Sequence, residues 1–413
     1  MKTKLFMHFL TTIITIITIQ SSSSNALAEV TPIDVLRHHT VMAHAKYEDA
    51  LFSAKQLDSA INLLITSPTQ KNLDNARLQW IKARIPYQQS ETYLFGNKIF
   101  NDFNKKVNLW NLDEGLIDYV DNSYTTDKDH SGNILYNANI IANPKISVNN
   151  QEIDSSIISP ELIRRLNTAN NVDTNVTTGY HVIEFLLWGQ DSNTVTRGAG
   201  NRNYTDFSIK QCTGGNCKRR ADYLKAASKL LVSDLEEIKK SWENNGESTK
   251  IIMKDIKSGL NLMISGMTSL SYSELAVDRM NLGLILHDPK QEIDRFSDNT
   301  HVSYLYNVIG IVSNYTGEYT RINGEKIHGP SLSYLIGSKY KNLDLEIKNK
   351  LSNTLKSAHI LAEHAEHVES YDQMISSNNP IGNKIVQNVI NDLVEQTESI
   401  KKLRIVLDIE DTS

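Results

Sequence analysis

Long stretches of this chain contain no proline and place apolar residues three or four positions apart. Only eight prolines occur in 413 residues, and a proline inside a helix removes a backbone hydrogen bond and kinks or breaks it. Apolar residues at this spacing share one face of a helix. Residues 35–65 show the pattern most clearly and are predicted to form one long helix, with an apolar face made by Val41, Ala45, Leu51, Ala54, Leu57, Ile61 and Leu64.

The remaining periodic segments extend this pattern, and no convincing run of alternating apolar and polar residues indicates a sheet. We therefore expect an all-α protein built as two packed helical bundles, each of about four helices, with long polar connectors. Further helices are expected at residues 73–93, 178–188, 223–244, 251–286, 300–319, 343–374 and 385–409.

Two polar segments interrupt the helical pattern. Residues 122–159 are rich in Asn, Asp and Ser, and a second connector covers residues 190–211. Long loops of this kind are often functional or mobile. The second connector is the better domain boundary, so we expect an N-terminal bundle over residues 29–205 and a C-terminal bundle over residues 206–413.

The N-terminus has the organisation of a secretory signal peptide. Two lysines precede a short apolar run at residues 5–19, and residues 26–28, Ala-Leu-Ala, have the small-x-small form of a cleavage site. The run is too short and too rich in threonine for a comfortable membrane span. We expect residues 1–28 to be removed and the mature chain, without a transmembrane span, to reach the periplasm or outer envelope.

Charge and cysteine content narrow the class further. The net charge of −5 and a pI of about 6.2 give no basis for nucleic-acid binding, which usually needs a basic patch. The chain has two cysteines, Cys212 and Cys217, and export makes a disulfide the default interpretation. The same pair could hold a metal, but no second cysteine pair completes a zinc site.

The residues most suggestive of chemistry are His181 and Glu184. They lie three positions apart on a predicted helix and so share one face, and an imidazole with a carboxylate makes half of a site for zinc, iron or copper. Their neighbours, residues 182–188, are apolar apart from Glu184 itself. Buried titratable groups must pair with something or bind something. A core His–carboxylate pair that fixes helix packing is the simpler alternative.

Four segments carry a family resemblance. Residues 177–191, TTGYHVIEFLLWGQD, contain the pattern Gly-x-His-x-x-Glu, and residues 84–91, 110–120 and 296–301 read RIPYQQSE, WNLDEGLIDYV and FSDNTH. In this order they resemble the signature segments of the imelysin family, most closely its iron-regulated protein A sub-group. Asn111 stands where the family has Pro.

The resemblance implies two helical bundles, export, and a metal site at the bundle junction. The family was classed as metallopeptidases, whereas other members belong to bacterial iron acquisition and are treated as binding proteins. Two segments depart from the family pattern. Residues 289–295 lack the His of the family's acidic run, and residues 277–280 read VDRM where the family has GERM.

His181 and Glu184 supply only two ligands, so others must come from elsewhere. Each candidate also has a simpler role: His44 as a core histidine, Glu114 as a helix cap, Asp298 as the N-cap of the next helix. Oxygen-rich sets with one or two His suit iron, with zinc as the alternative. The candidate ligands are His44, Glu91, Glu114, Asp118, Asp298 and His301.

A hydrolytic zinc site needs three protein ligands, a water position and a general base. Neither H-E-x-x-H nor H-x-x-E-H occurs, and the near miss at residues 359–364 has one residue too many. We therefore expect a binder of a divalent or ferric ion, or a small chelate, in iron uptake with membrane components as partners. A zinc peptidase using Glu184, or a non-catalytic interaction module with a structural His/Glu pair, are the alternatives.

Overall fold

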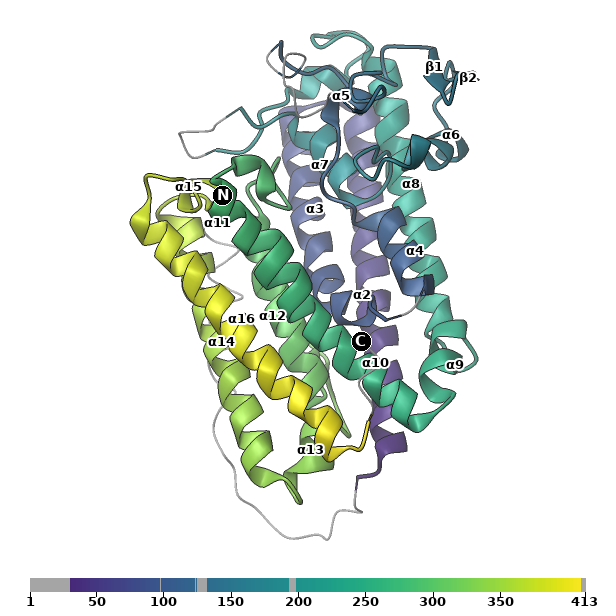
Figure 1. Ribbon diagram of the computed structural model, residues 1–413. Coiled ribbons are helices and arrows are strands. Elements are labelled where there is room, and N and C mark those ends of the chain that lie inside the picture. The colour runs from purple at the N-terminus through teal and green to yellow at the C-terminus, as the bar shows by residue number, and fades with distance from the viewer. Residues whose placement is uncertain (1–29, 97, 123, 125–131, 193–197, 410–413) are drawn as a thin grey trace.

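The computed structural model describes residues 30–409 except 97, 123, 125–131 and 193–197, so the expected signal peptide at residues 1–28 lies outside the described residues. The described chain is mainly helical, which confirms the predicted all-α class (Figure 1). The α-helices are α2 (Pro32–Thr66), α3 (Gln70–Ser90), α4 (Lys98–Val107), α5 (Glu114–Ile117), α6 (Pro160–Leu166), α7 (Tyr180–Trp188), α8 (Cys217–Ser241), α9 (Glu247–Met253), α10 (Ile256–Thr268), α11 (Leu282–Leu286), α12 (Thr300–Thr316), α13 (Leu332–Gly337), α14 (Lys341–His367), α15 (Tyr371–Met374) and α16 (Pro380–Val406).

Short helices of other types connect these elements. The 3₁₀ turns are η1 (Glu91–Tyr93), η4 (Ala169–Asn171), η5 (Tyr204–Phe207) and η7 (Pro289–Gln291), and η6 (Ser269–Asn281) is a π-helix between α10 and α11. No helix in the described ranges is both long and apolar enough to cross a bilayer.

The first helical group is formed by α2, α3 and α8, with α4 and α7 packed on α8 and α3 (Figure 1). Helix α2 begins sharply because Thr31 and Asp34 cap each other reciprocally and Pro32 occupies the first helical turn. Helix α3 continues through Pro86 to Ser90. Helix α8 packs on α2, although it follows the boundary expected at residue 205 in the sequence.

The second group is formed by α10, η6, α12, α14 and α16, which slant across the first group in Figure 1. The two groups meet where α12 packs against α3. Buried apolar residues of both groups belong to one continuous core. The junction is therefore tightly packed, and the chain segment entering α12 is held between the groups.

Two small hairpins are the strands of the described chain. Strand β1 (Lys145–Val148) pairs antiparallel with β2 (Gln151–Asp154), and β3 (Glu318–Thr320) pairs with β4 (Lys326–His328). The first hairpin lies in the polar segment that the sequence indicated as a loop. The second hairpin packs on α2, where the Tyr319 hydroxyl donates to Asp49.

Candidate metal centre

Helix α7 presents His181 and Glu184 together at the junction. All nine of its residues are buried, and its N-cap Gly179 has φ +92 and ψ −172, a backbone region open essentially to glycine alone. A Cβ at Gly179 would also lie 2.5 Å from the carbonyl oxygen of Val107. The glycine of the Gly-x-His-x-x-Glu pattern thus lets the helix begin directly against the last residue of α4.

Asp294 completes a group of three potential ligands. His181 Nδ1 lies 3.0 Å from Glu184 Oε2 and 3.6 Å from Asp294 Oδ1, and the three side chains are 0% exposed. One ligand atom from each lies within 4.8 Å of the others. Asp294 was not among the residues predicted from the sequence, although it lies in the segment 289–295 that departs from the family pattern.

The loop before α12 holds the two carboxylates in place. The backbone amide and the hydroxyl of Ser297 both donate to Glu184 Oε1, at 2.9 and 2.7 Å. Asp294 Oδ2 accepts hydrogen bonds from the Asn299 amide at 3.1 Å and from the Ser303 hydroxyl. The loop that enters the second helical group therefore supplies one candidate ligand and orients another that belongs to the first group.

Arg84 and Asn108 fix the other side of the imidazole. Arg84 is fully buried, and its Nη2 lies 3.0 Å from Asp294 Oδ1 while its Nη1 donates to Asn108 Oδ1 at 2.6 Å. Asn108 Nδ2 donates to Glu91 Oε1 at 2.6 Å. These two partners set the orientation of the Asn108 amide, so its oxygen faces His181 Nε2 at 3.3 Å.

This network assigns the histidine tautomer. Because Asn108 Oδ1 can only accept, the proton of a neutral His181 sits on Nε2, which leaves the Nδ1 lone pair facing Glu184 and Asp294. Two acceptors cannot face each other at 3.0 Å without a proton or a cation between them. A protonated Glu184 that donates to Nδ1 satisfies this requirement in the metal-free protein.

The charge states agree with that assignment. Burial lowers the pKa of His181 well below its usual value, and the positive charges of Arg84, Arg279 and Arg295 lower it further. Burial, followed by the negative charge of Asp294, raises the pKa of Glu184 well above its usual value. The hydrogen bonds from Ser297 oppose this rise only in part. A metal ion could therefore bind the free lone pair of the neutral imidazole and displace the proton from the Glu184 carboxyl.

Glu91 belongs to a second layer of this centre. Its Oε1 accepts from Asn108, and its Oε2 accepts from Arg279 Nη1 and Asn307 Nδ2, each at 3.1 Å. Arg279 comes from the π-helix η6, within the departing segment 277–280. Glu91 therefore reaches His181 only through Asn108, and Arg279 neutralises it.

Three other predicted residues are engaged elsewhere. Glu114 Oε1 pairs with Arg295 Nη2 at 2.5 Å, at the edge of the centre, because Arg295 follows Asp294. His301 Nε2 lies 3.3 Å from Glu366 Oε2. His44 is half-buried on α2; burial lowers its pKa, and the nearby charges come from Lys239, Glu48 and Glu243.

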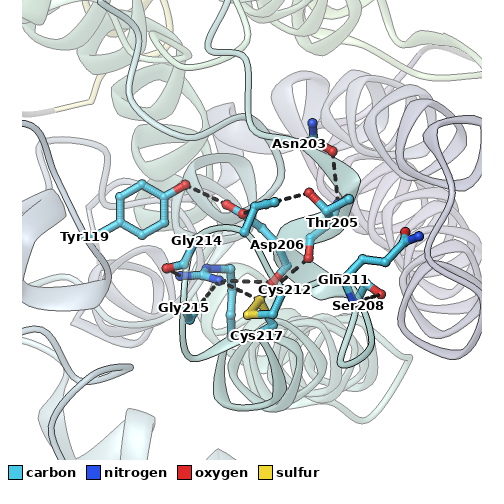
Figure 2. The surroundings of a disulfide bond; sticks show 12 residues. Tyr119, Asn203, Thr205, Asp206, Ser208, Gln211, Cys212, Gly214, Gly215 and Cys217 are labelled. Atoms are coloured by element: carbon cyan, nitrogen blue, oxygen red, sulfur yellow. Dashed lines mark hydrogen bonds between the residues drawn. A yellow bond between two sulfur atoms is a disulfide. The ribbon is translucent and has the colours of Figure 1, made fainter.

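Asp118 lies in a separate ion-pair network. Its Oδ2 is 2.9 Å from Arg202 Nη1 and 2.6 Å from Arg220 Nε. Arg220 also donates to the carbonyls of Gly214 and Gly215, in the turn closed by the Cys212–Cys217 disulfide (Figure 2). The Cα atoms of the two cysteines are 5.8 Å apart. Asp118 thus ties this turn to α5 rather than joining the His181 centre.

Asp298 is the remaining predicted residue, and it does not cap α12. Asn299 occupies the position before that helix. Asp298 instead lies with Glu292 and Asp372 in a second acidic group. Of the residues predicted from the sequence, His181 and Glu184 are therefore the two whose ligand atoms meet in the His181 centre.

The chain matches a known family in sequence and is similar to two solved structures in fold. A family model described as Imelysin matches residues 43–400 of the chain. A solved structure described as an iron-regulated protein A precursor, from Parabacteroides distasonis ATCC 8503, is similar with a TM-score of 0.60 and 15% identity, covering 92% of this chain and 98% of that chain. No curated protein sequence matches the chain significantly.

A second solved structure has the same arrangement. It is an imelysin-like protein from Psychrobacter arcticum 273-4, with a TM-score of 0.59 and 15% identity, covering 93% of this chain and 99% of that chain. At this level of identity, both likenesses concern the fold. The match of the family model is the finding that bears on ancestry.

Proposed function

The chain belongs to the imelysin family, and from that premise we propose that it binds a metal ion, iron in preference to zinc, through His181, Glu184 and Asp294. The role we propose is iron acquisition in an exported bacterial protein. The similar structure described as an iron-regulated protein A precursor is consistent with that role.

One observation carries the proposal. The Nδ1 lone pair of His181 faces two carboxylates within 4.8 Å in a fully buried setting. Imidazole and carboxylate donors together suit iron, whereas structural zinc sites favour Cys and His. The donors therefore fit the proposed ion in chemistry and in number, with Arg84 balancing the charge of Asp294.

Burial favours binding over proteolysis. The three ligand side chains are 0% exposed, so a polypeptide would need the junction to open, whereas an ion needs only a narrow path. Glu184 is also held by Ser297 through two hydrogen bonds, which leaves it poorly placed to act as a mobile general base. A binding protein makes fewer demands on this geometry than a peptidase does.

Metal analysis of protein purified without chelators tests the proposal. We expect about one iron per chain in the wild type, a loss of at least tenfold in His181→Ala and Asp294→Asn, and no loss in His301→Ala. His301 is a matched control because it is also a buried histidine, paired with Glu366 outside the centre. Metal-free wild-type protein that stays metal-free after reconstitution with iron would overturn the proposal.

A protease assay on an unfolded protein substrate separates the two family roles. We expect no cleavage above background with iron or zinc added, and no effect of a chelator. Cleavage that depends on zinc and disappears in Glu184→Gln would favour the peptidase. Sequencing of the N-terminus of protein from the periplasmic fraction tests export, with a mature start near Glu29 as the expected result.

A further inference from the structure

A second group of acids lies on the same loop as Asp294. It consists of Glu292 after η7, Asp298 before α12, and Asp372 in α15, and we call it the Glu292 cluster. One carboxylate oxygen from each residue lies within 4.8 Å of the others. Glu292 and Asp372 are each 2% exposed, whereas Asp298 is half-buried and connects the cluster to the surface.

Buried polar atoms around the cluster lack hydrogen bonds. Glu292 Oε2 has no hydrogen-bond partner among the described residues. The hydroxyls of Tyr304 and Tyr371 interact with each other, but neither has another partner at hydrogen-bond distance and angle in the described part of the chain. Both tyrosines are 1% exposed. Native proteins rarely bury such atoms unpaired, because each costs about 1–3 kcal/mol. Unpaired atoms gathered at one place therefore indicate a missing ligand.

The tyrosine hydroxyls lie close to the cluster. Burial and then the charge of Glu292 raise the pKa of Tyr371, and Glu292 also contributes to the raised pKa of Tyr304. The two rings are 5.4 Å apart in an edge-to-face arrangement. They form an apolar wall with polar tips beside the carboxylates, which would limit the access of bulk water to anything bound there.

The charge environment differs from that of the His181 centre. Burial raises the pKa of Glu292 well above its usual value, and the further charges that raise it are those of Asp298, Asp372 and Asp191. No arginine or lysine of the described residues is among the principal charges acting on it. At the His181 centre, by contrast, arginines supply positive charge, and Arg84 pairs directly with Asp294.

We propose that Glu292, Asp298 and Asp372 bind a second cation, a hard divalent ion of the calcium type, distinct from the ion at His181. The donors are all oxygen, without His or Cys, which suits Ca²⁺, Mg²⁺ or Mn²⁺. Ligands on opposite sides of Ca²⁺ lie up to ~5 Å apart and those of Mg²⁺ up to ~4.2 Å. One oxygen from each of the three carboxylates lies within 4.8 Å of the others, so a single ion of this class can contact all of them.

The position of the cluster gives this ion a structural task. Glu292 and Asp298 lie at either end of the segment that contains Asp294 and Ser297, and Asp372 belongs to α15. A bound ion would fasten this segment to α15. It would thereby hold Asp294 and Ser297 in the positions that they take toward His181 and Glu184.

Calcium titration of the full-length mature chain, stripped with EDTA and dialysed, tests the proposal. Isothermal titration is expected to give one Ca²⁺ per chain, and Ca²⁺ is expected to raise the Tm of the wild type. Glu292→Gln and Asp372→Asn should each weaken the affinity at least tenfold. Glu292→Gln replaces a carboxyl by an amide of the same shape, and circular dichroism verifies that the variant is folded.

A control variant makes the outcome specific. Glu398→Gln changes an exposed acid on α16 and should leave calcium binding unchanged. The absence of calcium binding to the wild type, or equal binding by Glu292→Gln, overturns the proposal. Because the probe is Ca²⁺ and the titration does not depend on His181, loss of iron binding alone would count against the proposed function and not against this site.

Discussion

Asp118 and Glu184 are both fully buried carboxylates in segments that carry the family pattern, yet their surroundings give them opposite properties. Burial alone would raise the pKa of Asp118, but Arg202 and Arg220 outweigh it and hold the pKa below its usual value. At Glu184, burial and Asp294 prevail over Arg84 and raise the pKa. A buried acid paired with two arginines is a structural tie, whereas one without sufficient counter-charge holds a proton or binds a cation.

Removal of the charge at Asp118 should have the largest effect. Asp118→Asn leaves Arg202 and Arg220 buried without their common partner, and breaking a buried ion pair from one side costs about 3–5 kcal/mol. We expect a loss of that size in the free energy of unfolding, measured by urea denaturation of metal-free protein. A loss below ~1 kcal/mol would mean that the arginines find other partners and that the pairing is not the main tie.

A glycine in each region, one at the start of α7 and one in the disulfide turn, allows the two regions to be compared at the level of the backbone. Gly179 begins α7 with φ +92 and has the Val107 carbonyl 2.5 Å from its would-be Cβ, whereas Gly215 in the disulfide turn has φ +66 and open space around that position. Gly215→Ala should cost ~1–2 kcal/mol from backbone strain alone. Gly179→Ala adds the overlap, at ~1–3 kcal/mol more.

Thermal and urea unfolding of the two glycine variants measure this difference. Gly179→Ala should also weaken metal binding, because the displaced helix start carries His181 with it. Equal losses in the two variants would show that strain, not the approach of Val107, explains the glycine in the Gly-x-His-x-x-Glu pattern.

The two regions also show which features could be predicted from the sequence and which could not. Helices such as α2, α8 and α16 were predicted from local periodicity, and His181 and Glu184 were placed on one face because they are three residues apart. Asp294 and Ser297 could not be assigned in this way, since Ser297 lies 113 residues from Glu184. Their position depends on the packing of α12 against α3, which no local pattern encodes.

Local sequence patterns also do not show which of the candidate carboxylates are paired with arginines. Asp118 and Glu91 were reasonable ligand candidates as carboxylates in family segments, but their roles depend on arginines at positions 202, 220 and 279. Those arginines come from distant segments, one of them the π-helix η6. The sequence shows which residues have side chains that can bind a metal. The positions of the arginines in the folded protein decide which of those side chains are already held in ion pairs.

The smallest stability effect is expected for Glu184→Gln, which imitates the protonated carboxyl. The amide can accept from Ser297 and donate to His181 Nδ1, so in metal-free protein at pH 5 the change should stay within ~1 kcal/mol. Because the pKa of Glu184 is higher in the folded than in the unfolded chain, the wild type loses stability as pH rises above about 4.5. The variant does not titrate there, so its stability relative to wild type should increase with pH, by at most ~1.4 kcal/mol per unit.

Asp118→Asn should behave in the opposite sense, which completes the comparison. The lowered pKa of Asp118 stabilises the folded wild type above about pH 3.8 and loses that contribution as pH falls through the folded value. The difference in unfolding free energy between Asp118→Asn and wild type should therefore become smaller as the pH falls. The difference between Glu184→Gln and wild type should instead change as the pH rises. Unfolding curves of the three proteins, measured from pH 3 to 8 after metal removal with a chelator, give both differences. A difference for Glu184→Gln that does not vary with pH would show that the proton facing His181 is not held by Glu184, and the tautomer assigned from Asn108 would then be wrong.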